Sequence, residues 1–420
     1  MNKLKILTIV YDLQKGGTQR AAQVFAEAYK NLNHDSRILS VYTGGSRYDE
    51  IKNEIKIWLF ANNENLAEIQ KWQPDILHIH SHGLKAEDVY QIINKTKNEK
   101  TKIIETNVFS SPSVWEEYLT YSFQLNNWAS WLYLMRGGNI NKIKIIPYPI
   151  NTNNFKKAAP ENIKKFKAHY NIPDNAFVLG RIGQSYTAKW SNMLISIFND
   201  LAKKNSNIYL VVVNPPNSII KDIEKSKFKK RIIHIPKIIG DNKLAIAYSS
   251  FDIMAHIAEK GESFGYVLTE SILCETPVVT LNTPWADNSQ AEVVDHLNGG
   301  YVVNSKKYFI QAILQYMKNP NSVNINKGRL NIIQRYHYEQ VAIDIIEQTM
   351  HKKGYTNIEI IKNNLLKIMD SCYGKPNIIA KIMIKYNLYK FRKLNLYNYP
   401  IKYLKDEIKR RILKKIFNKS

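Results

Sequence analysis

Short apolar runs alternate along this chain with longer segments in which apolar residues recur every three or four positions. The runs have the length of buried strands, and the longer segments have the period of amphipathic helices. A chain that alternates in this way builds βαβ units around a parallel sheet. In the N-terminal part we expect strands over 6–10, 36–41, 75–80 and 102–105, with a helix over 18–31.

The same alternation starts again further along the chain. Between the two cycles, Asn-rich and Pro-containing sequence over 151–174 interrupts the pattern and predicts a join. The predicted fold class is α/β, with two Rossmann-like domains that face a cleft and a basic helical C-terminal extension. The expected domains are 1–160, 161–350 and 351–420. The expected strands of the second cycle are 177–182, 208–213, 232–235, 251–255 and 301–303, and a helix is expected over 336–350.

Length and composition agree with two globular domains. The chain has 420 residues, which suits two domains of about 170 residues with an appendage, and its hydrophobic fraction of 44% allows sizeable cores. Cys274 and Cys372 form no disulfide framework, which fits a reducing cytoplasm. The first apolar run stops at Asp12, so a buried strand explains it better than a signal peptide. No run of 18 apolar residues predicts a membrane-spanning helix.

Positive charge is concentrated near the C-terminus. From Lys352 onward, 18 Lys and Arg residues stand against four acidic residues, a net +14 out of +24 for the chain. Such a segment indicates an anionic surface as partner. From Ile401 the sequence predicts a basic amphipathic helix, which would lie on an anionic membrane or pack on the protein body as an ordinary helix. Its apolar face is Ile401, Leu404, Ile408, Ile412 and Ile416, with Lys402, Lys409, Arg410, Arg411 and Lys414 around it.

The stretch from Glu262 to Glu270 carries the strongest chemical signal. Two carboxylates lie eight residues apart around a junction between a loop and a helix expected over 264–274. The first N–H groups of a helix bind anions, and Gly265 lets a phosphate approach the backbone closely. A pair of glutamates alone is more often a pair of solvated charges. The loop and the apolar run that follows favour a nucleotide-sugar site instead.

Residues 252–294 resemble the donor-site region of the retaining glycosyltransferases of family 4, which share the two-domain GT-B fold and a Glu-x7-Glu signature. Other motifs stand in the order of that family, and the resemblance covers about residues 1–350. These motifs are Gly16-Gly17-Thr18-Gln19-Arg20, Ile145-Ile146-Pro147-Tyr148-Pro149-Ile150, and Gly180-Arg181-Ile182 leading to Lys189. The resemblance implies an N-terminal acceptor domain, a C-terminal donor domain, and a helix over 336–350 that crosses back to the first domain.

The resemblance also implies roles for single residues. Glu262 would hold hydroxyls of the donor sugar, and Glu270 would hold the ribose. Arg181 and Lys189 would clamp the diphosphate, although outside these motifs both would be read as ordinary surface cations. The chain contains no Asp-x-Asp, so cations and helix N–H groups would stabilise the leaving diphosphate without a metal. The remaining donor-binding residues would be Gly16, Gly17, Ser263, Phe264, Gly265 and Tyr266.

The family's reaction keeps the configuration of the anomeric carbon. No obvious nucleophile stands out in the sequence. We therefore expect the leaving phosphate itself to accept the proton of the acceptor on the same face of the sugar.

Three histidines at the end of the strand over 75–80 are candidates for the acceptor side. His78, His80 and His82 would lie on one face of an extended segment, because side chains alternate along a strand. They fit a metal site, hydrogen bonds to the acceptor, or plain packing. His80 and His82 are the predicted acceptor contacts.

The sequence departs from the family pattern at three places. Many relatives carry a His after the strand that here ends in Glu105, Thr106 and Asn107, so Glu105 and Asn107 are the predicted replacements on the acceptor side. Glu275 stands where a Gly usually follows the helix, so we expect that helix to lack its left-handed cap. The segment 288–290 lacks the usual glycines, which puts its ligand contacts in doubt. Three tryptophans of the first domain, Trp115, Trp128 and Trp131, are expected in the core, with an acceptor face that touches lipid as the alternative.

The sequence thus predicts a metal-independent hexosyltransferase that uses a UDP- or GDP-linked sugar and extends a glycan or a polyprenyl- or lipid-linked acceptor in cell-surface polysaccharide synthesis. We expect it in the cytoplasm, on the inner face of the membrane, with no cofactor and no nucleic acid as partner. The alternatives are a nucleotide-sugar epimerase or hydrolase on the same fold, and a nucleic-acid-binding protein that uses the basic segment.

Overall fold

A computed structural model describes residues 3–351, 356–375, 378, 381–383 and 385–386. These residues form two compact units. Of the described residues, unit 1 contains 3–151, 335–351 and 356–363, and unit 2 contains 152–334 and those from 364 onward. The predicted amphipathic helix from Ile401 lies outside the described residues.

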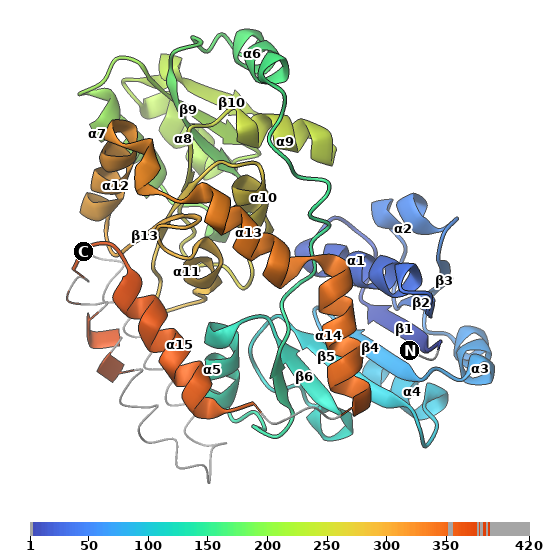
Figure 1. Cartoon of the computed structure of the whole chain (residues 1–420). Helices are drawn as coiled ribbons and strands as arrows, with labels where there is room; N and C mark the ends of the chain where they lie inside the picture. The colour runs from blue at the N-terminus through green and yellow to red at the C-terminus, as the bar shows by residue number, and fades with distance from the viewer. Residues whose placement is uncertain (1–2, 352–355, 376–377, 379–380, 384, 387–420) are drawn as a thin grey trace. The chain divides into compact units, whose positions relative to one another are not determined.

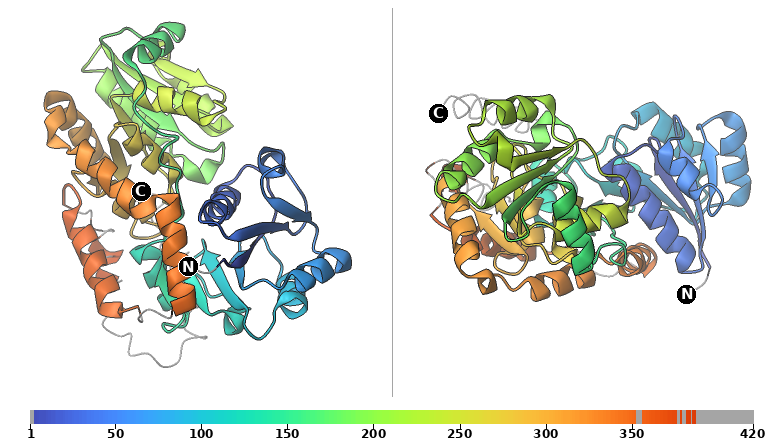
Figure 2. Two further views of the ribbon diagram at one scale, coloured as in Figure 1. Left: turned by 45° about the vertical axis from the view of Figure 1, so that its right-hand side comes forward. Right: turned by 90° about the horizontal axis from the view of Figure 1, so that it is seen from above.

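Unit 1 is built on a parallel sheet of seven strands in the order β3-β2-β1-β4-β5-β6-β7. The helices lie on both sides of this sheet (Figure 1; Figure 2). The strands are β1 Lys5–Val10, β2 Asp35–Ser40, β3 Lys56–Leu59, β4 Ile76–His80, β5 Lys102–Asn107, β6 Tyr121–Gln124 and β7 Ile143–Ile145. The helices are α1 Gly17–Asn31, α2 Ser46–Ile51, α3 Asn63–Trp72, α4 Ala86–Thr96, α5 Asn127–Met135 and α14 Tyr338–His351.

Alternate residues of the unit 1 strands pack on opposite faces of the sheet. Leu7 and Ile9 join the core under α3 and α4, whereas Val10 joins the core under α1 and α2. Helix α14 packs against α1 on the latter side. The segment before it is tied to the same unit, because Ile150 forms a parallel bridge with His337.

Unit 2 repeats the scheme with six parallel strands in the order β10-β9-β8-β11-β12-β13. The strands are β8 Phe177–Ile182, β9 Ile208–Val213, β10 Ile232–Ile235, β11 Ile253–His256, β12 Val278–Leu281 and β13 Gly300–Val303. The helices are α6 Pro160–His169, α7 Met193–Ala202, α8 Asn217–Lys225, α9 Asp241–Ser249, α10 Tyr266–Leu273, α11 Ser289–Val294 and α12 Lys306–Lys318. Helices α13 Ile325–Tyr336 and α15 Ile358–Ser371 contain residues of both units.

The prediction of an α/β protein with two Rossmann-like halves is confirmed. Each sheet is wholly parallel, and each has a switch point where the strand order reverses, between β1 and β4 and between β8 and β11. Ligands of such sheets bind outside the carboxyl ends of the strands at the switch point. The three tryptophans expected in the core are buried, with at most 5% of each side chain exposed. Among the described residues, none of the helices is long and apolar enough to cross a membrane.

The expectation that α10 lacks a left-handed cap is wrong. Glu275 itself takes the left-handed conformation, with φ of 61°. The N–H of Thr276 bonds to the carbonyl of Ser271 at 2.9 Å, and the N–H of Glu275 bonds to the carbonyl of Ile272 at 3.0 Å. This is the Schellman pattern. The carboxylate of Glu275 also pairs with Lys157 and with Arg329, each at 3.4 Å.

Replacing Glu275 by Gly or by Ala separates backbone strain from these ion pairs. Both variants lose the carboxylate, but only Gly removes the penalty of about 1 kcal/mol for a side chain in left-handed backbone. We expect Glu275→Gly to be more stable than Glu275→Ala by about that amount, seen as a higher midpoint in thermal unfolding. Equal midpoints for the two variants would contradict the assigned cap.

Candidate active site

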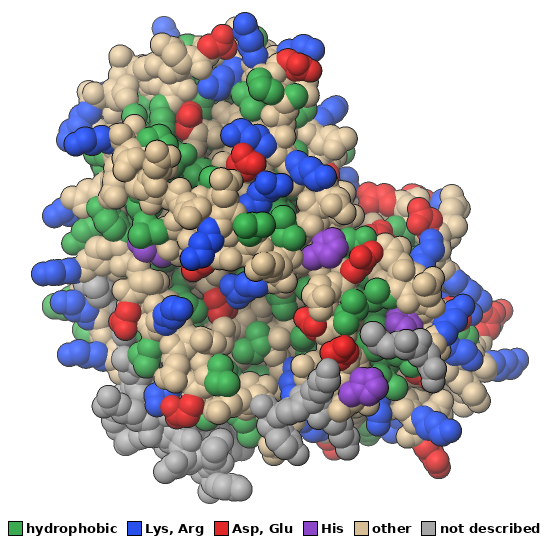
Figure 3. All heavy atoms as spheres, in the orientation of Figure 1, with side chains coloured by type: hydrophobic (Ala, Val, Ile, Leu, Met, Phe, Trp, Pro, Cys, Tyr) green, Lys and Arg blue, Asp and Glu red, His purple; other side chains and the backbone are tan. Residues whose placement is uncertain are grey.

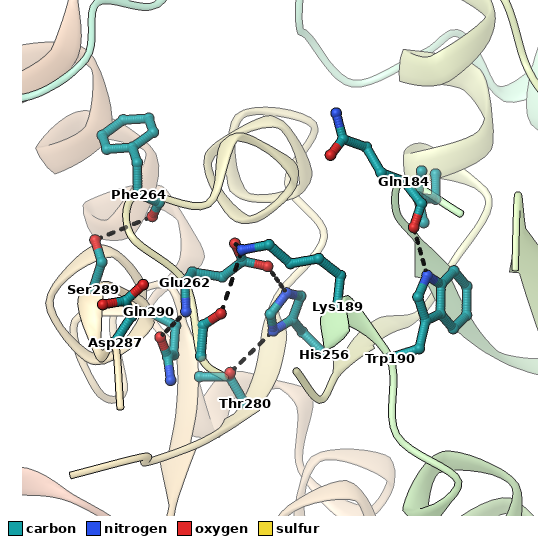
Figure 4. A network of polar contacts seen from close by, with 12 residues as sticks. Gln184, Lys189, Trp190, His256, Glu262, Phe264, Thr280, Asp287, Ser289 and Gln290 are labelled. Carbon is teal, nitrogen blue, oxygen red and sulfur yellow. Dashed lines mark hydrogen bonds and ion pairs between the residues drawn. The ribbon is translucent and has the colours of Figure 1, made fainter. Parts of the chain in front are cut away.

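The centre of the candidate site is the carboxylate of Glu262, in the loop between β11 and α10. The residue is buried, with 8% of its surface exposed. Its Oε2 atom pairs with the Lys189 ammonium at 2.5 Å, and its Oε1 atom lies 3.0 Å from His256 Nε2 (Figure 4). Two segments that are distant in the sequence therefore meet at one carboxyl group, one with Lys189 and one with His256 and Glu262.

Charge keeps Glu262 ionised in spite of its burial. Burial favours the neutral acid, but the Lys189 ammonium and the hydrogen bond with His256 outweigh it and lower the pKa of Glu262 to about 2. An ionised carboxylate only accepts hydrogen bonds. Glu262 is therefore suited to hold hydroxyl groups, and it cannot serve as a proton donor near neutral pH.

His256, the last residue of β11, stands behind this carboxylate. Burial, together with the nearby Arg181 guanidinium, lowers the pKa of His256 to about 4, so the imidazole is neutral at pH 7. Because Glu262 only accepts, Nε2 of His256 must carry the proton. Nδ1 then accepts from the Thr280 hydroxyl, whose oxygen is 3.3 Å away. The sequence reasoning missed His256, although a His that ends a strand six residues before Glu262 was a usable signal.

The loop over 283–290 fixes the backbone around Glu262. The side-chain oxygen of Gln290 accepts the Glu262 N–H at 3.0 Å, and the Ser289 N–H donates to the Glu262 carbonyl at 3.0 Å. The Ser263 hydroxyl donates to Asp287 at 2.8 Å. Polar side chains thus hold this segment, which contains no glycine over 288–290. Gln290, Ser289 and Asp287 are further site residues that the sequence analysis did not identify.

Arg181 supports the site from inside the protein. Its side chain is buried, with 1% exposed, and its guanidinium lies 4.7 Å from the centre of the Trp190 ring. It donates to the carbonyl of Ile182 and, at 2.5 Å, to the carbonyl of Lys189. Arg181 thereby fixes the backbone that carries Lys189, while 30% of the Lys189 side chain is exposed.

Glu270 occupies a different environment from Glu262. It lies in α10, is 3% exposed, and accepts a hydrogen bond of 2.8 Å from the Tyr248 hydroxyl. Helix α10 starts at Tyr266, two residues later than expected, because Gly265 takes a left-handed conformation with φ of 93°. Phe264 just before it is buried, with 4% exposed. The two predicted carboxylates therefore lie in the same unit, and Glu262 pairs with the Lys189 ammonium.

The Gly-Gly turn of unit 1 follows β1, as predicted. A Cβ atom on Gly16 would lie 2.2 Å from Oε1 of Gln19, whose amide nitrogen donates to Asp12 at 2.7 Å. A Cβ atom on Gly17 would meet no atom within 4 Å. A side chain at position 16 would therefore displace the end of the Gln19 side chain, whereas Gly17 borders open space.

The three histidines do not share one face, because β4 ends at His80. His78 and His80 are both buried with ring centres 4.5 Å apart, whereas His82 lies exposed in the following loop. His78 contacts the Tyr29 hydroxyl at 2.9 Å and the Thr106 hydroxyl at 2.7 Å. His80 has no hydrogen-bond partner at either ring nitrogen. Among the described residues, no group of three His, Cys, Asp or Glu side chains is arranged to hold a metal.

Glu105 and Asn107 are buried at the end of β5. Glu105 accepts hydrogen bonds from Ser113 and, at 3.1 Å, from Ser122, while burial raises its pKa. Asn107 binds backbone on both sides of its amide, donating to the Ser111 carbonyl at 2.7 Å. Both residues thus organise the loop after β5, and a contact between either of them and an acceptor stays a prediction.

The low pKa of His256 gives a testable pH dependence. Between pH 6.5 and about 4 the unfolded chain binds a proton at this residue that the folded protein does not bind, so stability falls as pH falls through this window. We expect the thermal midpoint to fall less between pH 6.5 and pH 4.5 in His256→Asn than in the wild type. His169→Asn, at an exposed position, should keep the wild-type slope. If the thermal midpoint of His256→Asn falls with pH as steeply as that of the wild type, a buried neutral imidazole at this position is contradicted.

Comparison with known proteins finds one family match and several similar folds. Residues 162–333 match the family model "Glycosyl transferases group 1". No curated protein matches the chain significantly in sequence. A glycosyltransferase from Rickettsia africae has 20% identity and a TM-score of 0.69, over 84% of this chain and 100% of its own.

Two further structures are similar. Anabaena HepE, solved with UDP and glucose, has 16% identity and a TM-score of 0.67, over 82% of this chain and 99% of its own. WaaG, a glycosyltransferase involved in lipopolysaccharide biosynthesis, has 14% identity and a TM-score of 0.58, over 82% of this chain and 99% of its own. The chain therefore has the GT-B fold, and its segment 162–333 matches the group 1 glycosyl transferases.

Proposed function

We propose that this protein is a retaining glycosyltransferase of the family 4 type that moves a hexose from a UDP- or GDP-linked donor to a glycan or lipid-linked acceptor in cell-surface polysaccharide synthesis. The observation that carries the proposal is the buried, ionised Glu262, held between Lys189 and His256 in the segment that matches group 1 glycosyl transferases. The UDP bound to HepE supports a UDP-linked sugar as the first donor to test.

Glu262 orients the donor sugar in this proposal. Its carboxylate accepts hydrogen bonds from sugar hydroxyls, and the fixed contacts to His256 and Gln290 hold it in place before the donor arrives. Pre-oriented groups of this kind lower the cost of reaching the transition state. Glu270, with its Tyr248 contact, takes the ribose hydroxyls.

Lys189 stabilises the diphosphate that leaves. Its ammonium is the exposed partner of the Glu262 pair, so it can neutralise phosphate oxygens while it stays close to the sugar-binding carboxylate. Arg181 contributes by fixing the Lys189 backbone, and its buried positive charge adds to that of Lys189. The N-terminus of α10, opened by Gly265, supplies N–H groups to the same phosphates together with Ser263, Phe264 and Tyr266. Cations and amides then do the work that an Asp-x-Asp motif with a metal does elsewhere.

Retention follows if the leaving phosphate accepts the acceptor proton. One bond breaks between the anomeric carbon and the phosphate oxygen, and one forms to the acceptor oxygen on the same face. The proton of the acceptor hydroxyl moves to the phosphate. Glu262, ionised and hydrogen-bonded, stays a ligand of the sugar and does not act as base.

Unit 1 takes the acceptor side in this proposal, with Gly16 and Gly17 near the donor phosphates and His80, His82, Glu105 and Asn107 toward the acceptor. We further propose that the 351–420 segment binds an anionic membrane surface at the inner face of the membrane, because it carries most of the excess positive charge. On the face drawn in Figure 3, Lys and Arg side chains are scattered among acidic ones and form no stripe of the kind that follows a nucleic-acid backbone.

Removing the charge of Glu262 tests the assignment. We expect Glu262→Gln to lower turnover by about 10²- to 10³-fold, because the amide cannot replace a charged acceptor at the sugar. The measurement is release of UDP or GDP from a panel of nucleotide sugars, with and without glycan acceptors. Glu259→Gln, at an exposed position three residues earlier, is the matched control and should stay close to wild type. Full turnover in Glu262→Gln would remove the central assignment, and sugar or epimer release without any acceptor would favour a hydrolase or an epimerase.

The configuration of the product tests the mechanism. With an α-linked donor, the first product observed by ¹H NMR should carry an α linkage. A β-linked first product, or a glycosyl adduct on the protein detected by mass spectrometry, would rule out transfer in which the leaving phosphate accepts the proton.

A further inference from the structure

Phe109 and His82 form an exposed aromatic pair in the loops that follow the central strands β5 and β4 of unit 1. Phe109 is 53% exposed, and its ring centre lies 5.2 Å from that of His82, with 39° between the planes. His82 is exposed as well. Neither side chain is among the buried residues that form the core. The pair is therefore a surface feature that packing alone does not explain.

The position of the pair in the fold is one where ligands bind. Strands β1, β4 and β5 are neighbours in the sheet, and Tyr11, His82 and Phe109 each follow one of them within two residues. The loop with His82 also touches Tyr11, since a Cβ atom on Gly83 would lie 2.7 Å from the Tyr11 ring. Three rings thus line the carboxyl edge of the parallel strands, next to the switch point between β1 and β4.

The loop that carries Phe109 is held firmly from below. The side-chain oxygen of Asn107 accepts the N–H of Phe109 at 3.1 Å and the N–H of Ser110 at 2.9 Å. The Arg136 guanidinium binds the carbonyl of Phe109 at 2.6 Å and that of Ser110 at 3.0 Å. Ser110 adopts the less favourable left-handed backbone, with φ of 53°. An ordered loop that keeps a large apolar ring in water is typical of a binding surface.

The chemistry of the pair fits the ring of a sugar. The face of a phenyl ring is electron-rich and packs on the C–H face of a pyranose, while a neighbouring imidazole donates and accepts hydrogen bonds with its hydroxyls. A bare hydrocarbon chain would use the phenyl ring but would leave the imidazole without a partner. We propose that Phe109 and His82 bind a sugar ring of the acceptor, so that the acceptor presents a saccharide and not only a lipid phosphate. This inference rests on the proposed glycosyltransferase function.

The test measures the binding of simple glycosides to the full chain by saturation-transfer NMR. The probes are the methyl glycosides of glucose, galactose, mannose and N-acetylglucosamine, with farnesyl phosphate as the lipid probe. We expect at least one glycoside to show transfer to its ring C–H protons. In Phe109→Leu, which keeps apolar surface but loses the aromatic face, affinity should fall about three- to tenfold. His82→Ala should weaken the same glycoside.

Val114→Ala is the matched control, because Val114 is 66% exposed in the same loop. It should bind the glycoside like the wild type, and all variants should keep the thermal shift that UDP or GDP causes in the wild type. Unchanged glycoside binding in Phe109→Leu, no binding of any glycoside, or Phe109-dependent binding of farnesyl phosphate alone would overturn the inference. If neither UDP nor GDP shifts the thermal midpoint of the wild type, the proposed donor site is contradicted. The glycoside result is then still valid.

Discussion

The ion pair between Lys189 and Glu262 is the interaction on which the candidate site depends. A carboxylate with 8% exposure would become neutral without a compensating charge, and a neutral acid would lose its strength as an acceptor for hydroxyls. Lys189 supplies that charge, but only where its own backbone is fixed. Arg181 fixes it by binding the Lys189 carbonyl, and Trp190 covers the Arg181 guanidinium from one side. Glu262 is thus kept ionised by Lys189, whose backbone is held in turn by the buried Arg181.

The backbone around Glu262 meets a second constraint, close packing against the loop over 283–290. Gly261 has φ of 65°, and a Cβ atom there would lie 1.8 Å from the Asp287 carbonyl oxygen. Gly265 has φ of 93° at the start of α10. Both positions exclude side chains for reasons of space and backbone conformation. The sequence Gly261-Glu262-Ser263-Phe264-Gly265 therefore places one charged side chain between two turns that only Gly tolerates easily.

Sequence alone predicts the parts of this protein that depend on local pattern. The apolar runs of β8, β9 and β10 are predicted to the residue. The strands β3, β6 and β7 were not predicted, because they are three or four residues long and mix polar with apolar side chains. They exist because neighbouring strands pair with them, which no local window records. In the site, the charged residues were named from the resemblance to a known family, whereas His256 and Gln290 bind Glu262 through contacts set by the fold.

The same distinction separates two kinds of residue at the ends of the unit 1 strands. Residue type and position at a strand end made Glu105 and Asn107 candidates for ligand contact, and both are buried with their hydrogen bonds directed to the loop after β5. The side-chain oxygen of Asn107 accepts the N–H groups of Phe109 and of Ser110, so this amide fixes the backbone that carries the Phe109 ring. Asn107 thus holds the loop that carries Phe109, and its own contact with an acceptor stays a prediction. The proposed sugar-binding role of Phe109 has no counterpart in the sequence analysis, because an isolated Phe in a loop has no sequence signal of its own.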